Sequence, residues 1–593
     1  MFNRRLRSFV SATLCLFLFF ALIPKLPADA ASFLLRGSGT ESNPYLISNA
    51  DELYALASSV NAGDPREGEF FLLTEDIVLN DISDFDEWTS VNRPENIWIP
   101  IGDALIEEGF ADGHYFSGHF DGGGHSITGA YIRSSAGLNG VGFFGIMRGG
   151  SVKNLSLHSF YIPENAARCG GIAGRAYGVE FENCIVSGRA GAIRCCGGIV
   201  GELEGGSITD CTASVHIACS ICAGGIVGSS SEVSVIDCRS LGSVCGDNYI
   251  GGTVGLAGAC TFTRCTSECA VSSIERAGAI SGFCFDSEFT QCTTGGSVFC
   301  GDYAGGIIGQ CQSAVISECE SQALIECDRY GGGAVGMCCG SAISLFRNRG
   351  EVSGEYYLGG VAGWSHNGND FGSLLPKTRY YDSGAVIAQC VNEARISGEW
   401  GIGGIVGDCH ETEINDSYNA GEIVSLQYAG GITGYTADCV IARCYNSGTV
   451  AAGYAVDALI GHNSTNLTEV SDCYYLDASC SSASVYGAAL THEELMLEQS
   501  YGGFDFESVW CLDEDTEYPY AELRGLIDEP ELLPGDLDSN GSVSVADAVL
   551  ALRGAMGLVE LTGDQIIAGD MNLDGSVSVL DAVSIMRIAI GLI

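Results

Sequence analysis

Two short acidic stretches near the end of the chain gather oxygen-bearing side chains at regular spacing. They are "GDLDSNGSVSVAD" (535–547) and "GDMNLDGSVSVLD" (569–581), near-copies that lie 34 residues apart. A Ca²⁺ ion needs several hard oxygen ligands from one tight turn, at loop positions 1, 3, 5, 7, 9 and 12, with glycine at position 6. The sequence therefore predicts two Ca²⁺ ions, whose ligands are Asp536, Asp538, Asn540, Ser542, Ser544 and Asp547 in the first loop, and Asp570, Asn572, Asp574, Ser576, Ser578 and Asp581 in the second.

A helical pattern follows each acidic loop, from Val545 to Met556 and from Val579 to Ile590. Position 12 is Asp where ordinary calcium loops have Glu, and no helical pattern precedes either loop. The alternative is a chance pair of acidic turns, but both copies keep the glycine at position 6. The two loop–helix units resemble a type I dockerin, the module that fits a cohesin in cellulosome-type assemblies. The resemblance implies a small all-α calcium-binding domain over residues 531–593.

The dockerin resemblance also implies a partner, the cohesin domain of a scaffoldin. In that family, loop positions 10 and 11 and residues further along the helix contact cohesin, and here these are Val545, Ala546, Arg553, Val579, Leu580 and Arg587. The apolar residues differ from the best-known Ser-Thr pattern, which leaves the cohesin type open. Because carboxylates that converge without a metal repel one another, this segment is expected to unfold in chelator.

Upstream of the loops, the chain repeats every 27 residues. Glycine-rich starts such as "GGIVG" recur at Gly170, Gly197, Gly224, Gly251, Gly278, Gly305, Gly332 and Gly359. The next start, Gly403, comes 44 residues later, which is one repeat plus an insertion of 17. Each unit is rich in glycine and β-branched residues, so it predicts short strands joined by tight turns. One unit cannot bury its own apolar face, and the units must therefore stack into a mainly β, parallel solenoid.

A cysteine recurs fourteen residues after most glycine starts, at Cys184, Cys211, Cys238, Cys265, Cys292, Cys319 and Cys444. A fixed position in stacked coils predicts an inward ladder, in which free cysteine packs as a small apolar residue. Buried thiols are the first interpretation, and disulfides between neighbouring coils or a metal cluster are the alternatives. Cys219 and Cys222 form a CxxC without a second pair, which is weak evidence for zinc.

The repeat unit, with its "GGIVG…ITDC…GSV" pattern, resembles the GLUG-motif repeats of bacterial surface and secreted proteins. The flanks 37–63 and 503–523 look like the usual beginning and end of that group. The resemblance implies a right-handed parallel β-helix with an adhesin-like or envelope role and no reaction. It divides the chain into an N-terminal cap with first coils (31–135), GLUG-type repeats (136–476), and a C-terminal cap with linker (477–530). Residues 51–61 and 491–500 read as short helices near the two ends of the tube.

The N-terminus and the charge both favour an exported protein. Basic residues, an apolar run and a small-residue site, Ala28-Asp29-Ala30, predict a signal peptide over residues 1–30. An uncleaved anchor is the alternative, although the run is short for a membrane span, and no membrane span is expected after cleavage. The net charge of −47, with only 27 Lys and Arg, argues against nucleic acid as a partner. We expect a secreted protein, extracellular or held at a cell surface through a cohesin scaffold.

An aromatic side chain recurs just before most glycine starts, at Tyr249, Tyr303, Tyr330, Tyr357, Trp400 and Tyr428. Stacked coils would align these rings, often beside a carboxylate, as a surface that suits sugar rings. The alternatives are a turn ladder that packs against itself and a catalytic cleft. The nine histidines hold no repeat position, and the HExxH, P-loop and GxSxG motifs are missing. The insertion, "WSHNGNDFGSLLPKTRY" (364–380), is either a functional loop or an inert one.

These observations predict a secreted, cellulosome-type component that docks through a calcium-dependent dockerin. Its β-helix would bind glycans or surfaces, such as plant cell-wall polysaccharide, during polysaccharide degradation. One alternative is an enzyme, either a glycoside hydrolase or a polysaccharide lyase on the β-helix, for which the sequence names no catalytic residue. Another is an adhesin for a host or neighbour-cell protein. The few basic residues weigh against a lyase, and a non-catalytic role is the main hypothesis.

Overall fold

The computed structural model of this protein divides into two compact units, with the boundary between Gly525 and Leu526. The residues it describes are 35–102, 114–134, 140–367, 384–465, 467–482, 484–512, 518–527, 533–559, 561–572 and 575–590. The predicted signal peptide, the predicted ligand Asp574 and most of the insertion lie outside the described residues. Within the described ranges, no helix has both the length and the apolar character that a membrane crossing requires.

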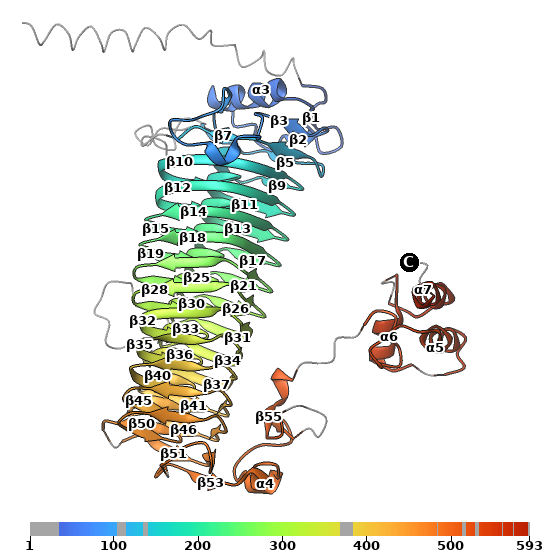
Figure 1. Cartoon of the computed structure of the whole chain (residues 1–593). Helices are drawn as coiled ribbons and strands as arrows, with labels where there is room; N and C mark the ends of the chain where they lie inside the picture. The colour runs from blue at the N-terminus through green and yellow to red at the C-terminus, as the bar shows by residue number, and fades with distance from the viewer. Residues whose placement is uncertain are drawn as a thin grey trace, which may run out of the picture. The chain divides into compact units, whose positions relative to one another are not determined.

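The first unit is a solenoid of short parallel strands, as the periodicity predicts (Figure 1). Val200 pairs with Val227 and Val227 pairs with Val254, so neighbours across the sheet are 27 residues apart. At the insertion the step becomes 44, where Ala362 pairs with Val406, and the following step is again 27. The predicted mainly β, parallel solenoid is confirmed.

Each coil contains strands on successive sides of the tube. The strands that follow the glycine starts are β8 (Phe144–Arg148), β11 (Ala173–Glu182), β13 (Val200–Thr209), β16 (Val227–Ser231), β20 (Val254–Gly258), β25 (Ser281–Phe285), β30 (Ile308–Gln312), β33 (Val335–Cys339), β36 (Ala362–His366), β40 (Val406–His410), β45 (Thr433–Ala437) and β50 (Ile460–Asn463). The next side, shared in part with long β11 and β13, holds β9 (Ser151–Lys153), β17 (Ser234–Ile236), β21 (Thr261–Thr263), β26 (Glu288–Thr290), β31 (Val315–Ser321), β34 (Ala342–Asn348), β37 (Ala385–Asn392), β41 (Thr412–Asn415), β46 (Val440–Ala442) and β51 (Glu469–Ser471). The strands that lead back to the glycine starts are β10 (Ser156–Gly170), β12 (Ile185–Gly197), β14 (Thr212–Cys219), β15 (Ile221–Gly224), β18 (Arg239–Gly246), β19 (Asn248–Gly251), β22 (Thr266–Ser267), β23 (Ala270–Ser273), β24 (Arg276–Gly278), β27 (Thr293–Thr294), β28 (Ser297–Cys300), β29 (Tyr303–Gly305), β32 (Leu324–Gly332), β35 (Val352–Gly359), β38 (Ile396–Gly398), β39 (Trp400–Gly403), β42 (Tyr418–Asn419), β43 (Ile423–Ser425), β44 (Ala429–Gly430), β47 (Tyr445–Asn446), β48 (Val450–Ala452) and β49 (Val456–Asp457).

Glycine is required where the chain folds back on itself in each coil. A Cβ atom at Gly255 would lie 2.6 Å from the backbone nitrogen of Ala223, and one at Gly336 would lie 2.6 Å from that of Ala304. The obstacle in both cases is backbone, which cannot move aside as a flexible side chain would. The glycine spacing of the repeat therefore reports a close backbone approach as well as tight turning.

Like positions form ladders inside the tube. The large apolar residues eleven positions after the glycine starts are buried, and the rings of Phe262 and Phe289 stack with centroids 4.7 Å apart. The predicted inward cysteine ladder is confirmed by the burial of Cys184, Cys211, Cys238, Cys265, Cys292, Cys319, Cys390 and Cys444. These thiols pack as small apolar side chains, and Phe346 takes the same position in the coil between Cys319 and Cys390.

A second internal ladder is made of asparagine and was not predicted. The side-chain nitrogen of Asn348 donates to Asn392 at 2.8 Å, Asn392 donates to Asn419 at 2.7 Å, and Asn419 donates to Asn446 at 2.7 Å. All four residues are fully buried. Each amide also donates to a backbone carbonyl two residues on, so the buried polar groups satisfy one another from coil to coil.

The N-terminal coils are less regular than the rest, and a helix covers them (Figure 1). Helix α3 (Ala50–Asn61) forms where the sequence predicts it, is capped by Asn49, and buries Leu53, Leu56 and Val60 in the solenoid core. The short strands around it are β1 (Tyr45–Ile47), β2 (Phe70–Leu73), β3 (Ile77–Val78), β4 (Ile97–Trp98), β5 (His119–Asp121), β6 (Ser126–Thr128) and β7 (Tyr131–Ile132). The helix thus shields strand edges that would otherwise invite aggregation.

The other end of the solenoid is followed by a segment that returns along the coils. Strands β52 (Tyr474–Leu476) and β53 (Ala488–Leu490) lead into α4 (His492–Leu495), which starts with a Thr491–Glu494 capping box inside the predicted helical stretch. The hairpin of β54 (Trp510–Cys511) and β55 (Glu522–Leu523) then packs against coil side chains. The indole nitrogen of Trp510 donates to Asp416 at 3.2 Å, and the Tyr445 hydroxyl donates to the Ala521 carbonyl at 2.5 Å.

The second unit contains three helices, α5 (Val545–Ala555), α6 (Gly563–Gly569) and α7 (Val579–Ala589), in its described part. The predicted helices after the two acidic loops are present as α5 and α7. Their buried core is small and consists of Leu537, Ala548, Ala551, Ala582 and Ile585. A core of this size makes further support from outside the apolar residues necessary for a stable fold.

Candidate functional site

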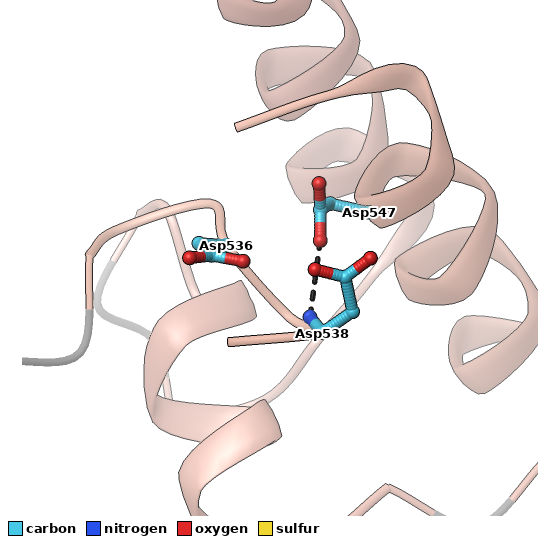
Figure 2. Close-up of side chains that lie close together, drawn as sticks. All are labelled: Asp536, Asp538 and Asp547. Carbon is cyan, nitrogen blue, oxygen red and sulfur yellow. Dashed lines mark hydrogen bonds between the residues drawn. The ribbon is translucent and has the colours of Figure 1, made fainter. Parts of the chain in front are cut away.

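The first acidic loop brings three carboxylates together in front of α5 (Figure 2). One oxygen each from Asp536, Asp538 and Asp547 lie within 4.8 Å of one another. Backbone groups hold them in place: Gly541 N–H donates to Asp536 at 2.7 Å, and Asp538 N–H donates to Asp547 at 3.0 Å. The first, third and twelfth residues of the loop thereby point toward one place.

The carboxylates of this loop have different surroundings: against the effect of burial, hydrogen bonds from Ser544 and Asp538 lower the pKa of Asp547. Asp536 and Asp547 are buried, and within the described ranges none of the three carboxylates forms an ion pair with Lys or Arg. Loss of hydration within the loop and the negative charge of Asp547 raise the pKa of the Asp538 carboxyl. Converging, partly dehydrated oxygens of this kind are the donors that Ca²⁺ prefers, and the residues present fit that ion.

The second loop repeats the same local design. Gly575 N–H donates to Asp570 at 2.6 Å, which matches the contact of Asp536. Met571 N–H, at loop position 2, donates to Asp581 at 3.1 Å, whereas Asp547 accepts from Asp538 at loop position 3. Asp581 is buried, as its counterpart is. The two copies therefore agree in structure at the first and last loop positions, where the predicted ligands are aspartates.

The serines at loop position 9 also begin the helices. Ser544 accepts from Ala546 N–H at 3.1 Å and donates to Asp547 at 2.8 Å, and Ser578 makes the equivalent contacts with Leu580 and Asp581. Each loop is therefore continuous with a capping box, which fixes the carboxylate at position 12 against the first turn of the helix. Of the other predicted ligands, Asn540 accepts from the hydroxyl of Ser542 at 2.6 Å; Asn572 and Ser576 lie in the described part of the second loop.

The residues predicted to contact cohesin lie on the outside of α5 and α7. Val545, Val579 and Leu580 are 48%, 52% and 72% exposed, and Ala546, Arg553 and Arg587 are exposed as well. Val549 and Val583, one turn further along each helix, add to the exposed apolar area. Exposed apolar side chains therefore gather at the start of both helices.

The aromatic row predicted on the solenoid is present and half-buried. The rings of Tyr303 and Tyr330 stack with centroids 5.3 Å apart, and those of Tyr330 and Tyr357 stack at the same distance. Trp400 meets Tyr357 edge-on at 4.8 Å and Tyr428 edge-on at 5.2 Å. Stacking between the rings is compatible with both hypotheses for this row, namely sugar binding and packing of the turns against one another.

A second row of rings, five residues after the glycine starts, lies beside the first. Contacts between the rows join Tyr249 with Phe283 (5.5 Å), Tyr330 with Trp364 (5.2 Å), Trp400 with Tyr435 (5.6 Å) and Tyr428 with His462 (4.8 Å). We call the two rows together the aromatic face. Sequence reasoning found only the first row, because the second alternates rings with Leu256, Gln310, Met337 and Asp408.

An acid–imidazole pair lies within the aromatic face and was also missed. His410 Nε2 lies 2.9 Å from Asp408 Oδ1, and this hydrogen bond raises the pKa of His410. Asp408 is buried. Burial first, and then the charge of Asp408, raise the pKa of Tyr357 to about 12, so its hydroxyl stays protonated at neutral pH.

The expectation that the histidines hold no repeat position is wrong for two of them. His366 and His410 each lie seven residues after a glycine start, at Gly359 and Gly403. The register agrees, because Ser365 pairs with Cys409. The insertion between these coils hides the shared position, and subtracting its 17 residues from the 44-residue step would have revealed it.

Two sequence comparisons match this chain, and each covers a small part of it. The family model described as "The GLUG motif" matches residues 194–218. A protein of Evansella cellulosilytica named "Putative Gly-rich membrane protein" is 32% identical over 176 residues, which is 29% of this chain. The chain spans only 18% of the length of that relative. The GLUG motif is thus matched in one stretch of the β-solenoid, residues 194–218.

Two solved structures are similar over most of the chain at low identity. One is a "putative immunoglobulin A1 protease from Bacteroides ovatus", at 15% identity and a TM-score of 0.20, covering 82% of this chain and 94% of that one. The other is the "Mannuronan C-5 epimerase AlgE6 A-module" of Azotobacter vinelandii, at 11% identity and a TM-score of 0.26, covering 77% and 97%.

Proposed function

We propose that residues 526–593 are a calcium-dependent docking module of the dockerin type, which attaches an exported β-solenoid to a cohesin-bearing scaffold. The observation that carries the proposal is the convergence of Asp536, Asp538 and Asp547 within 4.8 Å, with no cationic side chain paired to them in the described residues. Asp570 and Asp581 repeat part of this arrangement. Two bound Ca²⁺ ions would neutralise the loops and fix the starts of α5 and α7.

The exposed residues at those helix starts support a protein partner. Val545 and Val579 occupy equivalent positions in the two copies, and each is about half exposed. A partner that buries them gains on the order of 1.5–3 kcal/mol for each large apolar side chain. Calcium would act indirectly in this contact, by holding the helices at the angle that presents both patches.

The proposal is tested by titrating the full chain with cohesins from the same organism, in Ca²⁺ and in excess chelator. We expect binding in Ca²⁺ alone, and loss of binding in Leu580→Glu. The matched control is Val440→Glu, which changes an exposed apolar residue of the solenoid. If no cohesin binds in Ca²⁺, or if Leu580→Glu binds as well as the control, the docking proposal is wrong.

A second candidate function is glycan binding on the aromatic face. It is favoured by the continuous ring contacts from Tyr303 to Tyr357 and on to Trp400 and Tyr435, since aromatic faces and edges pack against sugar rings. The chain carries 74 acidic residues against 27 Lys and Arg, so its field repels acidic polysaccharides and favours neutral ones. A plant cell-wall glycan without charge fits this chemistry.

Glycan binding is tested by retention on insoluble neutral and acidic polysaccharides. We expect retention on a neutral glycan, reduced at least tenfold in the double variant Tyr330→Ala/Trp400→Ala. The control is Phe299→Ala, which removes an exposed ring of β28. Equal retention of the double variant and the control would reject the aromatic face as the site. Release of sugar products in the same assay, lost in His410→Ala, would assign an enzyme instead.

A further inference from the structure

The cysteines of the solenoid fall into two structural kinds. In the regular ladder, each Sγ donates to the backbone carbonyl two residues earlier, at 3.3 Å for Cys211 and 3.2 Å for Cys319. These thiols are satisfied within their own coil. Two other pairs have Sγ atoms 2.8 and 3.0 Å apart across neighbouring coils. Thiol–thiol contacts also join Cys195 with Cys222 and Cys311 with Cys338.

The first pair is Cys169 and Cys196. They are directly opposed in the parallel strands β10 and β12, and their Sγ atoms are 2.8 Å apart. Both side chains are fully buried. Paired residues of adjacent parallel strands lie about 4.8 Å apart, which falls within the range of Cα separations, about 4.4–6.8 Å, that a disulfide accepts.

The second pair is Cys409 and Cys439, whose Sγ atoms are 3.0 Å apart at a corner of the tube. The same corner holds a polar pair in other coils: Ser230 with Cys260 at 3.4 Å, Cys311 with Ser341 at 3.5 Å, and Ser365 with Thr412 at 3.0 Å. The corner is thus built to bring two side-chain donors together. At Cys409 and Cys439, both partners are thiols.

The environment of the second pair also favours thiolate chemistry. The thiol–thiol hydrogen bond with Cys409, the largest cause, lowers the pKa of Cys439 to about 7. A thiolate is the attacking species in disulfide exchange, and this hydrogen bond favours the thiolate of Cys439 over that of Cys409, whose pKa is raised.

We propose that Cys169–Cys196 and Cys409–Cys439 are joined by disulfide bonds between neighbouring coils in the exported protein. Each bond forms as two thiols lose two protons and pass two electrons to an oxidant of the disulfide class. One thiolate attacks the disulfide of the oxidant, which forms a mixed disulfide and releases one thiol of the oxidant. The second thiolate then attacks the protein sulfur of the mixed disulfide and releases the remaining sulfur of the oxidant as a second thiol. Because both pairs are buried, the exchange takes place during folding, before the coils close.

The positions of the two pairs give the bonds a role. Cys169 and Cys196 lie at the start of the 27-residue array that begins at Gly170, and Cys409 and Cys439 lie in coils near its end. Repeat proteins open from their ends, where a coil has one neighbour and not two. Covalent links at these two places would tie neighbouring coils together near the beginning and the end of the regular array.

The proposal is tested on the full chain, refolded with oxidised glutathione and then alkylated in denaturant without reductant. Peptide mapping by mass spectrometry should find the two named linkages, each two hydrogens lighter than the dithiol, with the ladder cysteines alkylated. Reduction should lower the midpoint of thermal unfolding. Finding Cys169, Cys196, Cys409 and Cys439 alkylated, or linked at random with ladder cysteines, would overturn the proposal.

A gain-of-bond variant supplies an independent arm. Ser341→Cys places a new thiol beside Cys311 at the same corner, while Cys338 already lies opposite Cys311 in the paired strand, and a linkage between Cys311 and the new thiol should appear. Ser317→Cys is the matched control, because the Ser317 hydroxyl faces Thr290 and no thiol. If Ser341→Cys adds no bond although the variant folds, the corner geometry does not promote cross-linking, and the assignment of Cys409–Cys439 fails with it.

Discussion

Removal of calcium is expected to unfold residues 526–593 while the solenoid stays folded. The module buries a core of only Leu537, Ile585 and three alanines, so it depends on its loops. One ion at a hundred times its Kd contributes about 2.7 kcal/mol, and two sites contribute about 5 kcal/mol. That equals the whole stability of a typical small domain at the low end of the range, about 5 kcal/mol. Without the ions, three converging carboxylates in the first loop add repulsion to the loss.

Hydrogen exchange with mass spectrometry on the full chain measures this effect in each unit separately. In excess chelator, peptides covering α5 and α7 should lose nearly all protection, whereas peptides from β20 and its neighbours should keep theirs. Asp536→Asn should weaken protection in the same peptides at limiting Ca²⁺. Glu507→Gln, an exposed residue outside both loops, is the control and should behave as the unchanged chain does.

The reasoning would be refuted by full protection of α5 and α7 in chelator. Such a result would mean that the small core and the capping boxes are sufficient by themselves. Loss of protection in the solenoid together with the helices would also contradict it, because the aspartate loops belong to the second unit alone. Calcium binding measured by calorimetry on the same sample decides whether the ions bind at all.

Three further outcomes follow from the solenoid. Asn392→Ala removes one member of the asparagine ladder and should destabilise the solenoid by about 1–3 kcal/mol for each partner left unsatisfied, measured by denaturant unfolding. Gly255→Ala places a Cβ 2.6 Å from backbone and should cost about 1–3 kcal/mol or more, seen as a lower thermal midpoint. Asp408→Asn should lower the pKa of His410, measured by NMR titration of labelled histidine. Because that pKa is raised in the folded state, the wild-type pair stabilises the fold below pH about 6.5 and loses this contribution as pH rises through the folded pKa.

The regular coils could be predicted from sequence because one physical constraint acts on every repeat. Val200, Val227 and Val254 pair in register, and the glycines that allow the backbone approach recur at the same interval. The cysteine ladder is predicted by the same 27-residue spacing. A residue that returns every 27 positions must point the same way in each coil, so its burial needs no knowledge of its neighbours.

The features that sequence did not predict depend on contacts between residues at different positions of the repeat. The pair of Asp408 and His410 arises where one coil has polar residues at positions that are apolar in some other coils. The 17-residue insertion before this coil breaks the 27-residue spacing, so that spacing alone does not show the shared position. The return of Trp510 onto Asp416 joins residues 94 apart in sequence, which no local pattern indicates. The acidic loops were readable because their ligands come from one short stretch.

The ladders also set a rule for how the length of this rod can change. Each coil adds one rung to every internal ladder, and Asn392 bonds to Asn419 in the same way that Asn419 bonds to Asn446. Loss or duplication of a whole 27-residue unit therefore rejoins rung to rung, and the 17-residue insertion leaves the ladders in register, since Asn348 still bonds to Asn392 across the 44-residue step. Recombination between repeats would lengthen or shorten the cylinder in whole coils, and the chain could evolve its reach without rebuilding its interior.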